Sequence, residues 1–265
     1  MVTAASSPAD VRRAAWQERF SGLTTGLAPG YVQANLAVLP ANHAEDFVAF
    51  CHANASACPV LAVSKAGDPR LRELGEDIDI RSDLPAYWVF RDGKRAETVK
   101  DIAALWQDDF VAVAIGCWFS MEDALARAGV RQRHIELGIQ GPLFRTTRET
   151  VRIGRFGGPL VVSMRPFAAD AVETVRQVTA RFSRVHGAPL HTGDPAALGI
   201  TDIGAPDFGE VLMPLAGEVP MFWGCGLTAL AALEQSGIPL FITHAAGAML
   251  VTDLRNDDLE DRPER

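Results

Sequence analysis

The stretch from His186 to Pro195, HGAPLHTGDP, holds two histidines and an aspartate among glycines and prolines. These residue types fit a divalent metal site on His186, His191 and Asp194, a phosphate-binding loop, or a rigid turn beside a pocket. The spacing matches no familiar metal or nucleotide signature, and Pro189 in an extended stretch would point the histidines apart. We expect a rigid turn that presents His191 and Asp194 to a pocket. No cofactor is predicted, and a metal is the weaker alternative.

Two similar corners, GCWFSMEDALARAG and GCGLTALAALEQSG, each follow an apolar strand and lead into a helix. Each has a cysteine in second place, Cys117 or Cys225, and a hydroxyl in fifth place, Ser120 or Thr228. The hydroxyls fall where helix N-caps are expected, beside free N–H groups that attract anions. The corners could therefore hold carboxylates, or they could simply be tight packing. A helix N-terminus also lowers the pKa of a thiol, which makes Cys225 a candidate nucleophile; the alternative is a small buried side chain.

Two apolar strands end in residues that can bind or react. Arg165 ends VVSMRP, and a buried guanidinium there needs a carboxylate from Glu122, Glu218 or a substrate. His244 closes PLFITH, where a histidine can act as a general acid or base. The alternative is that His244 has a structural role and only hydrogen-bonds to groups at the end of the strand.

The elements that position these residues alternate between strands and helices. We expect helices over residues 11–20, 44–55 and 120–129, and strands over 58–64, 85–94 and 110–117. This alternation predicts an α/β sandwich with a mostly parallel sheet. Hairpins and one long helix, ADAVETVRQVTARFSRV, predict a smaller two-layer α+β domain over residues 131–195. It would be inserted into a larger discontinuous domain of residues 1–130 and 196–265.

Local signals refine this outline. Asp92-Gly93 predicts a tight turn, and Ser7 before a proline predicts a capped helix start. The repeated tripeptide GDP predicts helix caps at Asp68 and Asp194. The charged tail of residues 255–265 lacks apolar anchors, so we expect it to fray.

Composition limits the partners. A net charge of −8 over 265 residues argues against nucleic acid or an anionic membrane surface as the main partner. The four cysteines form no C-x-x-C pair, which disfavours a disulfide scaffold or structural zinc. No secretory signal is visible, so a cytoplasmic protein is expected. Trp88 and Trp118 are interpreted as core residues. A homo-oligomer is left open.

Seven motifs in order resemble the bacterial hydro-lyases of the YcsI type, whose domain also occurs in D-glutamate cyclase: GYVQANLAVLP, FCHANASACPVLAVSKAGDP, GCWFSMEDAL, GPLVVSMRP, RVHGAPLHTGDPAALGI, VPMFWGCGLT and ITHAAGAMLVTD. The resemblance implies a two-domain α/β enzyme that eliminates water, with closure of glutamate to 5-oxoproline as one such reaction. One segment departs from the family pattern. Thr147 and Thr150 stand where the family tends to have asparagine and cysteine, which would alter substrate choice if they line the pocket.

The predicted function is a hydro-lyase acting on a small amino or hydroxy carboxylic acid. A non-catalytic protein that binds a small carboxylate, and a thiol enzyme, are the alternatives. The catalytic candidates are His244, His191, Glu122, Asp194 and Cys225. The substrate-binding candidates are Arg165, Ser120, Thr228, His186 and Cys117.

Overall fold

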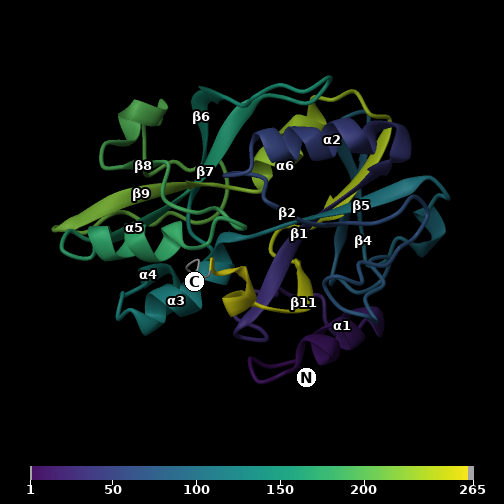
Figure 1. Cartoon of the computed structure of the whole chain (residues 1–265), viewed down its shortest axis with the longest axis horizontal. Helices are drawn as coiled ribbons and strands as arrows, with labels where there is room; N and C mark the ends of the chain where they lie inside the picture. Colours follow the sequence, from purple (N-terminus) through teal and green to yellow (C-terminus); the bar gives the residue numbers. More distant parts are fainter. Residues whose placement is uncertain (1, 262–265) are drawn as a thin grey trace.

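Two β-sheets lie side by side in the computed structural model, which describes residues 2–261 (Figure 1). The larger sheet runs in the order β2-β5-β1-β10-β3-β4, and β11 also pairs with β1. Its strands are β1 (Tyr31–Pro40), β2 (Val60–Val63), β3 (Tyr87–Arg91), β4 (Lys94–Val99), β5 (Phe110–Ile115), β10 (Leu240–His244) and β11 (Leu250–Arg255). The smaller sheet runs in the order β6-β7-β9-β8. Its strands are β6 (Leu143–Glu149), β7 (Pro159–Ala168), β8 (His191–Thr192) and β9 (Glu218–Gly224).

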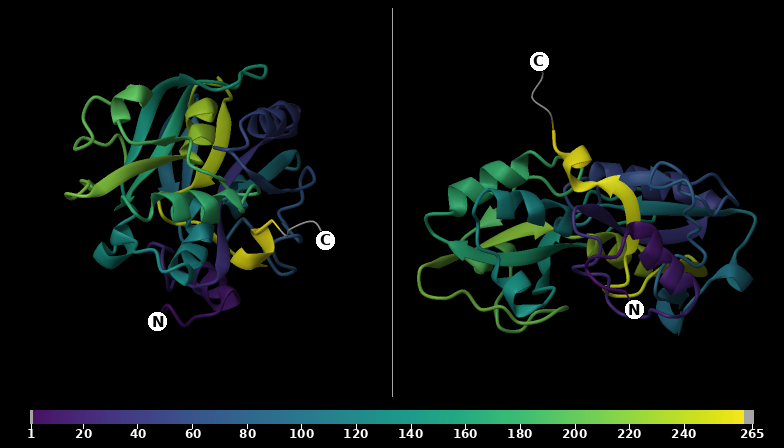
Figure 2. Two further views of the ribbon diagram at one scale, coloured as in Figure 1. Left: turned by 60° about the vertical axis from the view of Figure 1, so that its left-hand side comes forward. Right: turned by 90° about the horizontal axis from the view of Figure 1, so that it is seen from below.

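The helices are short and pack on the faces of these sheets (Figure 2). The α-helices are α1 (Pro8–Trp16), α2 (Ala41–Ala53), α3 (Glu122–Arg127), α4 (Arg133–Leu137), α5 (Val172–Ala180) and α6 (Leu227–Glu234). Four 3-10 turns complete the set: η1 (Ala103–Leu105), η2 (Trp118–Met121), η3 (Pro195–Leu198) and η4 (Asn256–Leu259). Within residues 2–261, no helix has both the length and the apolar character needed to cross a bilayer.

The mixed α/β composition is confirmed, but the predicted mostly parallel sheet is wrong. Every pairing between the named strands within residues 2–261 is antiparallel. The strand β1 shows why the sequence misleads. Ala37 and Leu39 face one apolar cluster, while Leu36 and Val38 face another on the opposite side. A strand buried on both faces is continuously apolar whichever way its neighbours run, so an apolar run alone does not indicate a parallel sheet.

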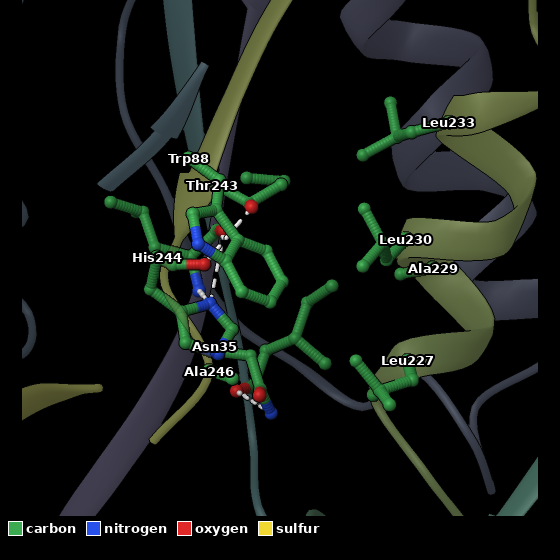
Figure 3. Close-up of a pocket in the computed structure, with 13 residues that line it drawn as sticks. Asn35, Trp88, Leu227, Ala229, Leu230, Leu233, Thr243, His244 and Ala246 are labelled. Atoms are coloured by element: carbon green, nitrogen blue, oxygen red, sulfur yellow. Dashed lines mark hydrogen bonds between the residues drawn. The ribbon is translucent and has the colours of Figure 1, made fainter. Parts of the chain in front are cut away.

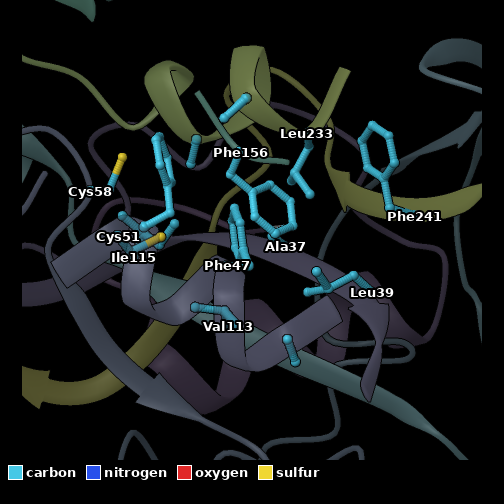
Figure 4. Packing of buried hydrophobic residues seen from close by; sticks show 14 of the residues in the cluster. Ala37, Leu39, Phe47, Cys51, Cys58, Val113, Ile115, Phe156, Leu233 and Phe241 are labelled. Atoms are coloured by element: carbon cyan, nitrogen blue, oxygen red, sulfur yellow. The ribbon is translucent and has the colours of Figure 1, made fainter. Parts of the chain in front are cut away.

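Helices α2 and α6 cover one face of the larger sheet. Phe47 and Phe50 from α2 pack against Phe156, with the rings of Phe47 and Phe156 centred 5.2 Å apart, and Leu233 of α6 joins the same cluster (Figure 4). The predicted inward face of α2, with Phe47, Phe50 and Cys51, is confirmed by their complete burial. This core fixes α6, whose first turn borders the site described below.

The local predictions had mixed outcomes. Asp92 and Gly93 form the β3–β4 turn with φ of 49° and 75°, and Ser7 caps α1. Asp194 caps η3 through the backbone N–H of Ala196 at 2.9 Å. The predicted helix after Asp68 is wrong, because this carboxylate accepts from the N–H of Arg70 in a turn without helix.

Two element lengths also differ from the prediction. The long helix predicted before His186 is confined to α5, because residues 181–190 form turns and bends. Much of the charged tail is ordered as the end of β11 and as η4, and residues 262–265 lie outside the described residues. The predicted domain boundary at residue 195 stays a prediction. Strand β9, which follows it, pairs with β7 from Val162 opposite Gly224 to Ala168 opposite Glu218.

A buried arginine attaches α1 to the larger sheet. The guanidinium of Arg12 donates to the carbonyl of Val251 at 2.9 Å and to the carboxylates of Asp253 and Asp77. We expect Arg12→Ala to lower the free energy of unfolding by about 2 kcal/mol. This is below the ~3–5 kcal/mol of a fully buried pair, because Asp77 and Asp253 are partly exposed and can be rehydrated. Urea unfolding measures the change.

The matched control is Arg13→Ala, which removes an exposed ion pair with Asp10 on the same helix. It should change the unfolding free energy by less than about 0.5 kcal/mol. Equal effects of the two substitutions would contradict the anchoring role of Arg12.

Candidate active site

A cavity of about 140 Å³ lies between the two sheets. Strands β1, β3 and β10 contribute Asn35, Trp88 and His244, while β7 contributes Ser163 and Arg165. Both predicted corners also border it, through Cys117 on one side and residues 224–227 on the other. An engineered cavity of about 150 Å³ holds benzene, so this space suits a small organic molecule.

The structure brings together half of the residues that the sequence singled out. The predicted residues that line the cavity are His244, Cys225, Arg165, His186 and Cys117. Trp88 and Trp118, which were interpreted as core residues, also line the cavity, and four lining residues were not singled out: Asn35, Gln140, Ser163 and Phe208. Two of these carried a usable signal. Ser163 lies two residues before Arg165, on the same face of a strand, and Asn35 is one of two amides, with Gln33, in the mostly apolar β1.

The histidine loop does not present His191 and Asp194 to this cavity, so that expectation is wrong. Nε2 of His191 lies 2.7 Å from the backbone carbonyl of Asp194, and its ring packs on Phe222. Asp194 is committed to capping η3. Of the three residues, His186 alone lines the cavity. In residues 2–261 no group of three or more His, Cys, Asp or Glu side chains is arranged to hold a metal ion.

The two corner hydroxyls also point elsewhere. The cap positions are Cys117 and Gly226, so Ser120 and Thr228 lie inside η2 and α6 and not at the caps where they were predicted. Thr228 Oγ1 accepts from the N–H of Val161 at 3.0 Å and donates to the carbonyl of the same residue at 3.2 Å. It therefore fastens α6 to β7. Ser120 is buried, and its hydroxyl has no partner among residues 2–261.

Neither carboxylate predicted to pair with Arg165 does so. Glu122 lies with Oε1 2.8 Å from Nε2 of His134, and Glu218 pairs with Arg133. Burial raises the pKa of Glu122 to about 8 and lowers the pKa of His134 to about 2, so this pair is held as a neutral acid and a neutral imidazole. A neutral Glu122 supplies no charge to balance Arg165.

Arg165 is a buried cation, with 3 % of its surface exposed. Its guanidinium donates to the carbonyls of Met164, at 2.8 Å, and of Gln140, and its Cζ lies 5.0 Å from the ring centre of Trp118. Its Nε has no hydrogen-bond partner among residues 2–261, and no carboxylate there forms an ion pair with it. Burial lowers its pKa, but an arginine side chain stays charged in proteins. The cavity thus contains a positive group that forms no ion pair among residues 2–261.

The two cavity cysteines are protonated thiols. Burial raises the pKa of Cys225 to about 11 and that of Cys117 to about 12. For Cys225 this outweighs the backbone N–H of Leu227, which lowers the pKa in the direction predicted from the sequence. A neutral thiol is a weak nucleophile, so the arrangement disfavours thiol chemistry.

The two cavity histidines are neutral at pH 7. His186 Nδ1 lies 2.9 Å from the carbonyl of Ser56, and burial lowers the pKa of this imidazole to about 4. His244 Nδ1 lies 3.2 Å from the backbone N–H of Leu36, and burial likewise lowers its pKa to about 4. Arg165 is therefore the one permanent positive charge among the residues that line the cavity.

A small apolar hollow of about 30 Å³ adjoins the cavity, and the two share Asn35, Trp88 and His244. Trp88 and His244 lie on one side, opposite Leu227, Leu230 and Leu233 of α6 (Figure 3). The site therefore has a charged end at Arg165 and an apolar end toward α6. This asymmetry suits a ligand with one anionic group and an apolar remainder.

Thr147 and Thr150 do not line the cavity, so the condition under which they would alter substrate choice is not met. Thr150 Oγ1 donates to the carbonyl of Gly158 at 2.9 Å, and Thr147 Oγ1 to that of Leu198 at 3.5 Å. Both hydroxyls therefore hydrogen-bond to loop backbone next to β6.

Comparison with known proteins identifies the class as the hydro-lyases. A protein of Paraburkholderia phymatum named "Putative hydro-lyase" is 53 % identical over 254 residues, covering 96 % of this chain and 98 % of the relative. Relatives with that name from Burkholderia multivorans and Jannaschia sp. are each 51 % identical, covering 96 % and 90 % of this chain and 97 % and 90 % of their own lengths. The profile of the D-glutamate cyclase family matches residues 111–253. The chain belongs to this family, and the predicted lyase class is confirmed.

One solved structure, a nitrogen repressor-like protein from Methanococcus jannaschii, covers 89 % of this chain and 91 % of its own. Its TM-score is 0.37 at 12 % identity, which is too low to relate the two folds.

The buried His186 makes stability depend on pH. Its pKa is about 4 in the folded chain, against about 6.5 when hydrated, so the unfolded chain takes up the proton first. Its stabilising contribution is present above pH 6.5 and is lost as the pH falls toward 4, at up to about 1.4 kcal/mol per pH unit. His186→Asn keeps a donor for Ser56 but removes the titration. Unfolding free energies measured between pH 7 and 4.5 should then fall less steeply than in the wild type.

The control is His52→Asn on the exposed side of α2. It should leave the slope unchanged, because folding does not bury the side chain of His52. An unchanged slope in His186→Asn would show that His186 is hydrated in the folded protein.

Proposed function

We propose that the chain is a hydro-lyase that removes water from a small hydroxy or amino carboxylic acid, with the substrate carboxylate bound to Arg165. The observation that carries this proposal is the buried guanidinium at the cavity wall, whose Nε has no partner among residues 2–261. Leaving a buried charge unpaired costs several kcal/mol, and a bound carboxylate compensates it. A charge-assisted hydrogen bond of this kind contributes about 1.5–3 kcal/mol.

The charge of the cavity favours a monocarboxylate over a dicarboxylate. Arg165 neutralises one carboxylate, and the apolar end toward Leu230 offers no cation for a second. A 3-hydroxy acid such as 3-hydroxybutyrate meets this requirement. Its dehydration breaks a C–H bond beside the carboxylate and the C–O bond at the next carbon. Cyclisation of D-glutamate to 5-oxoproline also releases water, but it starts from a substrate with two carboxylates.

The test is turnover of 3-hydroxybutyrate and D-glutamate, measured by product formation, together with thermal stabilisation by each acid. We expect turnover and stabilisation with the hydroxy acid. Arg165→Met should abolish both, because it keeps the apolar stem and removes the cation. The control is Arg176→Met, which removes an exposed i,i+3 ion pair on α5 and should leave both intact.

Two other outcomes separate the alternatives. Stabilisation without product, lost in Arg165→Met, indicates a non-catalytic carboxylate-binding protein. Neither stabilisation nor turnover across a panel of small carboxylic acids contradicts the proposal.

A further inference from the structure

The two cavity histidines have opposite backbone partners. Nδ1 of His186 lies 2.9 Å from the carbonyl oxygen of Ser56. A carbonyl only accepts, so Nδ1 carries the hydrogen and Nε2 keeps a lone pair. Nδ1 of His244 lies 3.2 Å from the N–H of Leu36 and 3.5 Å from the carbonyl of that residue. We assign the closer N–H group as the donor to Nδ1, which places the hydrogen of this imidazole on Nε2; the opposite tautomer would donate from Nδ1 to the more distant carbonyl.

The fold fixes both backbone partners. The carbonyl of Ser56 packs against Gly224, where an added Cβ would lie 2.4 Å from that oxygen, so the glycine corner holds it in place. His244 follows Thr243, which pairs with Ala37, so the register of β10 on β1 brings His244 to Leu36. Both tautomers therefore follow from backbone positions in two well-packed strands and a tight corner.

The remaining ring nitrogens are free for a ligand. The hydrogen bonds of both histidines to other residues in the range 2–261 are made through Nδ1, and both histidines line the cavity that contains Arg165. Five titratable side chains line it: Cys117, Arg165, His186, Cys225 and His244. The thiols and the guanidinium hold their protons, and His244 presents an N–H group. His186 is thus the one titratable lining side chain with a lone pair available to take a proton.

We propose that His186 is the proton acceptor of the site and that His244 is a hydrogen-bond donor. This assignment differs from the one made from the sequence, where His244 or His191 takes the proton and His186 binds substrate. It rests on the proposed function, because it names the groups that act on the bound acid beside Arg165.

The elimination then balances with a single base. Nε2 of His186 takes the hydrogen from the carbon beside the carboxylate, and the C–H electron pair forms the C=C bond. The C–O bond breaks with its electron pair, and the hydroxyl leaves as water with the proton that His186 releases. His244 and Arg165 stabilise the negative charge that develops on the carboxylate oxygens. His244 can donate this hydrogen bond as a neutral imidazole. It keeps its proton, because losing the proton would leave an imidazolate.

The tautomers can be measured without a substrate. Long-range ¹H–¹⁵N spectra of the protein labelled at histidine distinguish a protonated Nδ1 from a protonated Nε2. The signals of the two cavity histidines are assigned by their loss in His186→Asn and His244→Gln. We expect Nδ1–H in His186 and Nε2–H in His244 at pH 7. Equal tautomers in the two residues, or the reverse assignment, would overturn the proposal whatever the substrate is.

A kinetic comparison uses 3-hydroxybutyrate as the probe. Glutamine can supply an N–H group near the position of Nε2 but cannot act as a base. His186→Gln should therefore lower kcat by about 10²–10⁴-fold, while His244→Gln should lower it by less than about tenfold and His244→Ala by more. A larger loss in His244→Gln than in His186→Gln refutes the assignment. If the wild type has no turnover, the proposed function fails on this substrate and the spectra still decide the tautomers.

Discussion

The site depends on one electrostatic constraint, a buried guanidinium that forms no ion pair with any carboxylate among residues 2–261. Arg165 is held by two backbone carbonyls and by the face of Trp118, which fix its position but do not neutralise it. The two acidic groups expected to do so, Glu122 and Glu218, are occupied by His134 and Arg133. Such an arrangement is costly, and in the proposed function a bound substrate carboxylate offsets this cost. This explains why a mostly apolar cavity contains one strong charge.

The antiparallel fold brings the other polar groups to this charge. Strand β7 carries Arg165 and pairs with β9, whose end at Gly224 leads into the α6 corner. Strand β10 carries His244 to the same cavity from the larger sheet. Because both sheets contribute, residues far apart in sequence meet in one place. The tight contacts of Gly224 with Ser56, and of Gly226 with Asn35, show that the corners are packed to hold these positions.

The sequence revealed those features of the site that depend on residue type and local pattern. A polar residue where an apolar run stops pointed to Arg165 and His244, although Arg165 lies inside β7 and not at its end. The repeated glycine-cysteine corners pointed to Cys117 and Cys225. Strand direction could not be inferred, because β1 is buried on both faces. The roles of His191 and Thr228 were misjudged because their partners, the backbones of Asp194 and Val161, depend on the local fold and on strand packing. The tautomers of His186 and His244 could not be predicted from the sequence, because they depend on which backbone group lies next to each imidazole ring.

The most direct test of the account is a crystal structure of the protein with and without 3-hydroxybutyrate. The account predicts a ligand-free cavity in which no protein carboxylate lies within 4 Å of the Arg165 guanidinium. In the complex, a carboxylate oxygen of the ligand should lie within hydrogen-bond distance of Nε. A ligand-free structure in which Glu122 or another acidic side chain pairs with Arg165 would contradict it, because the charge would then need no substrate.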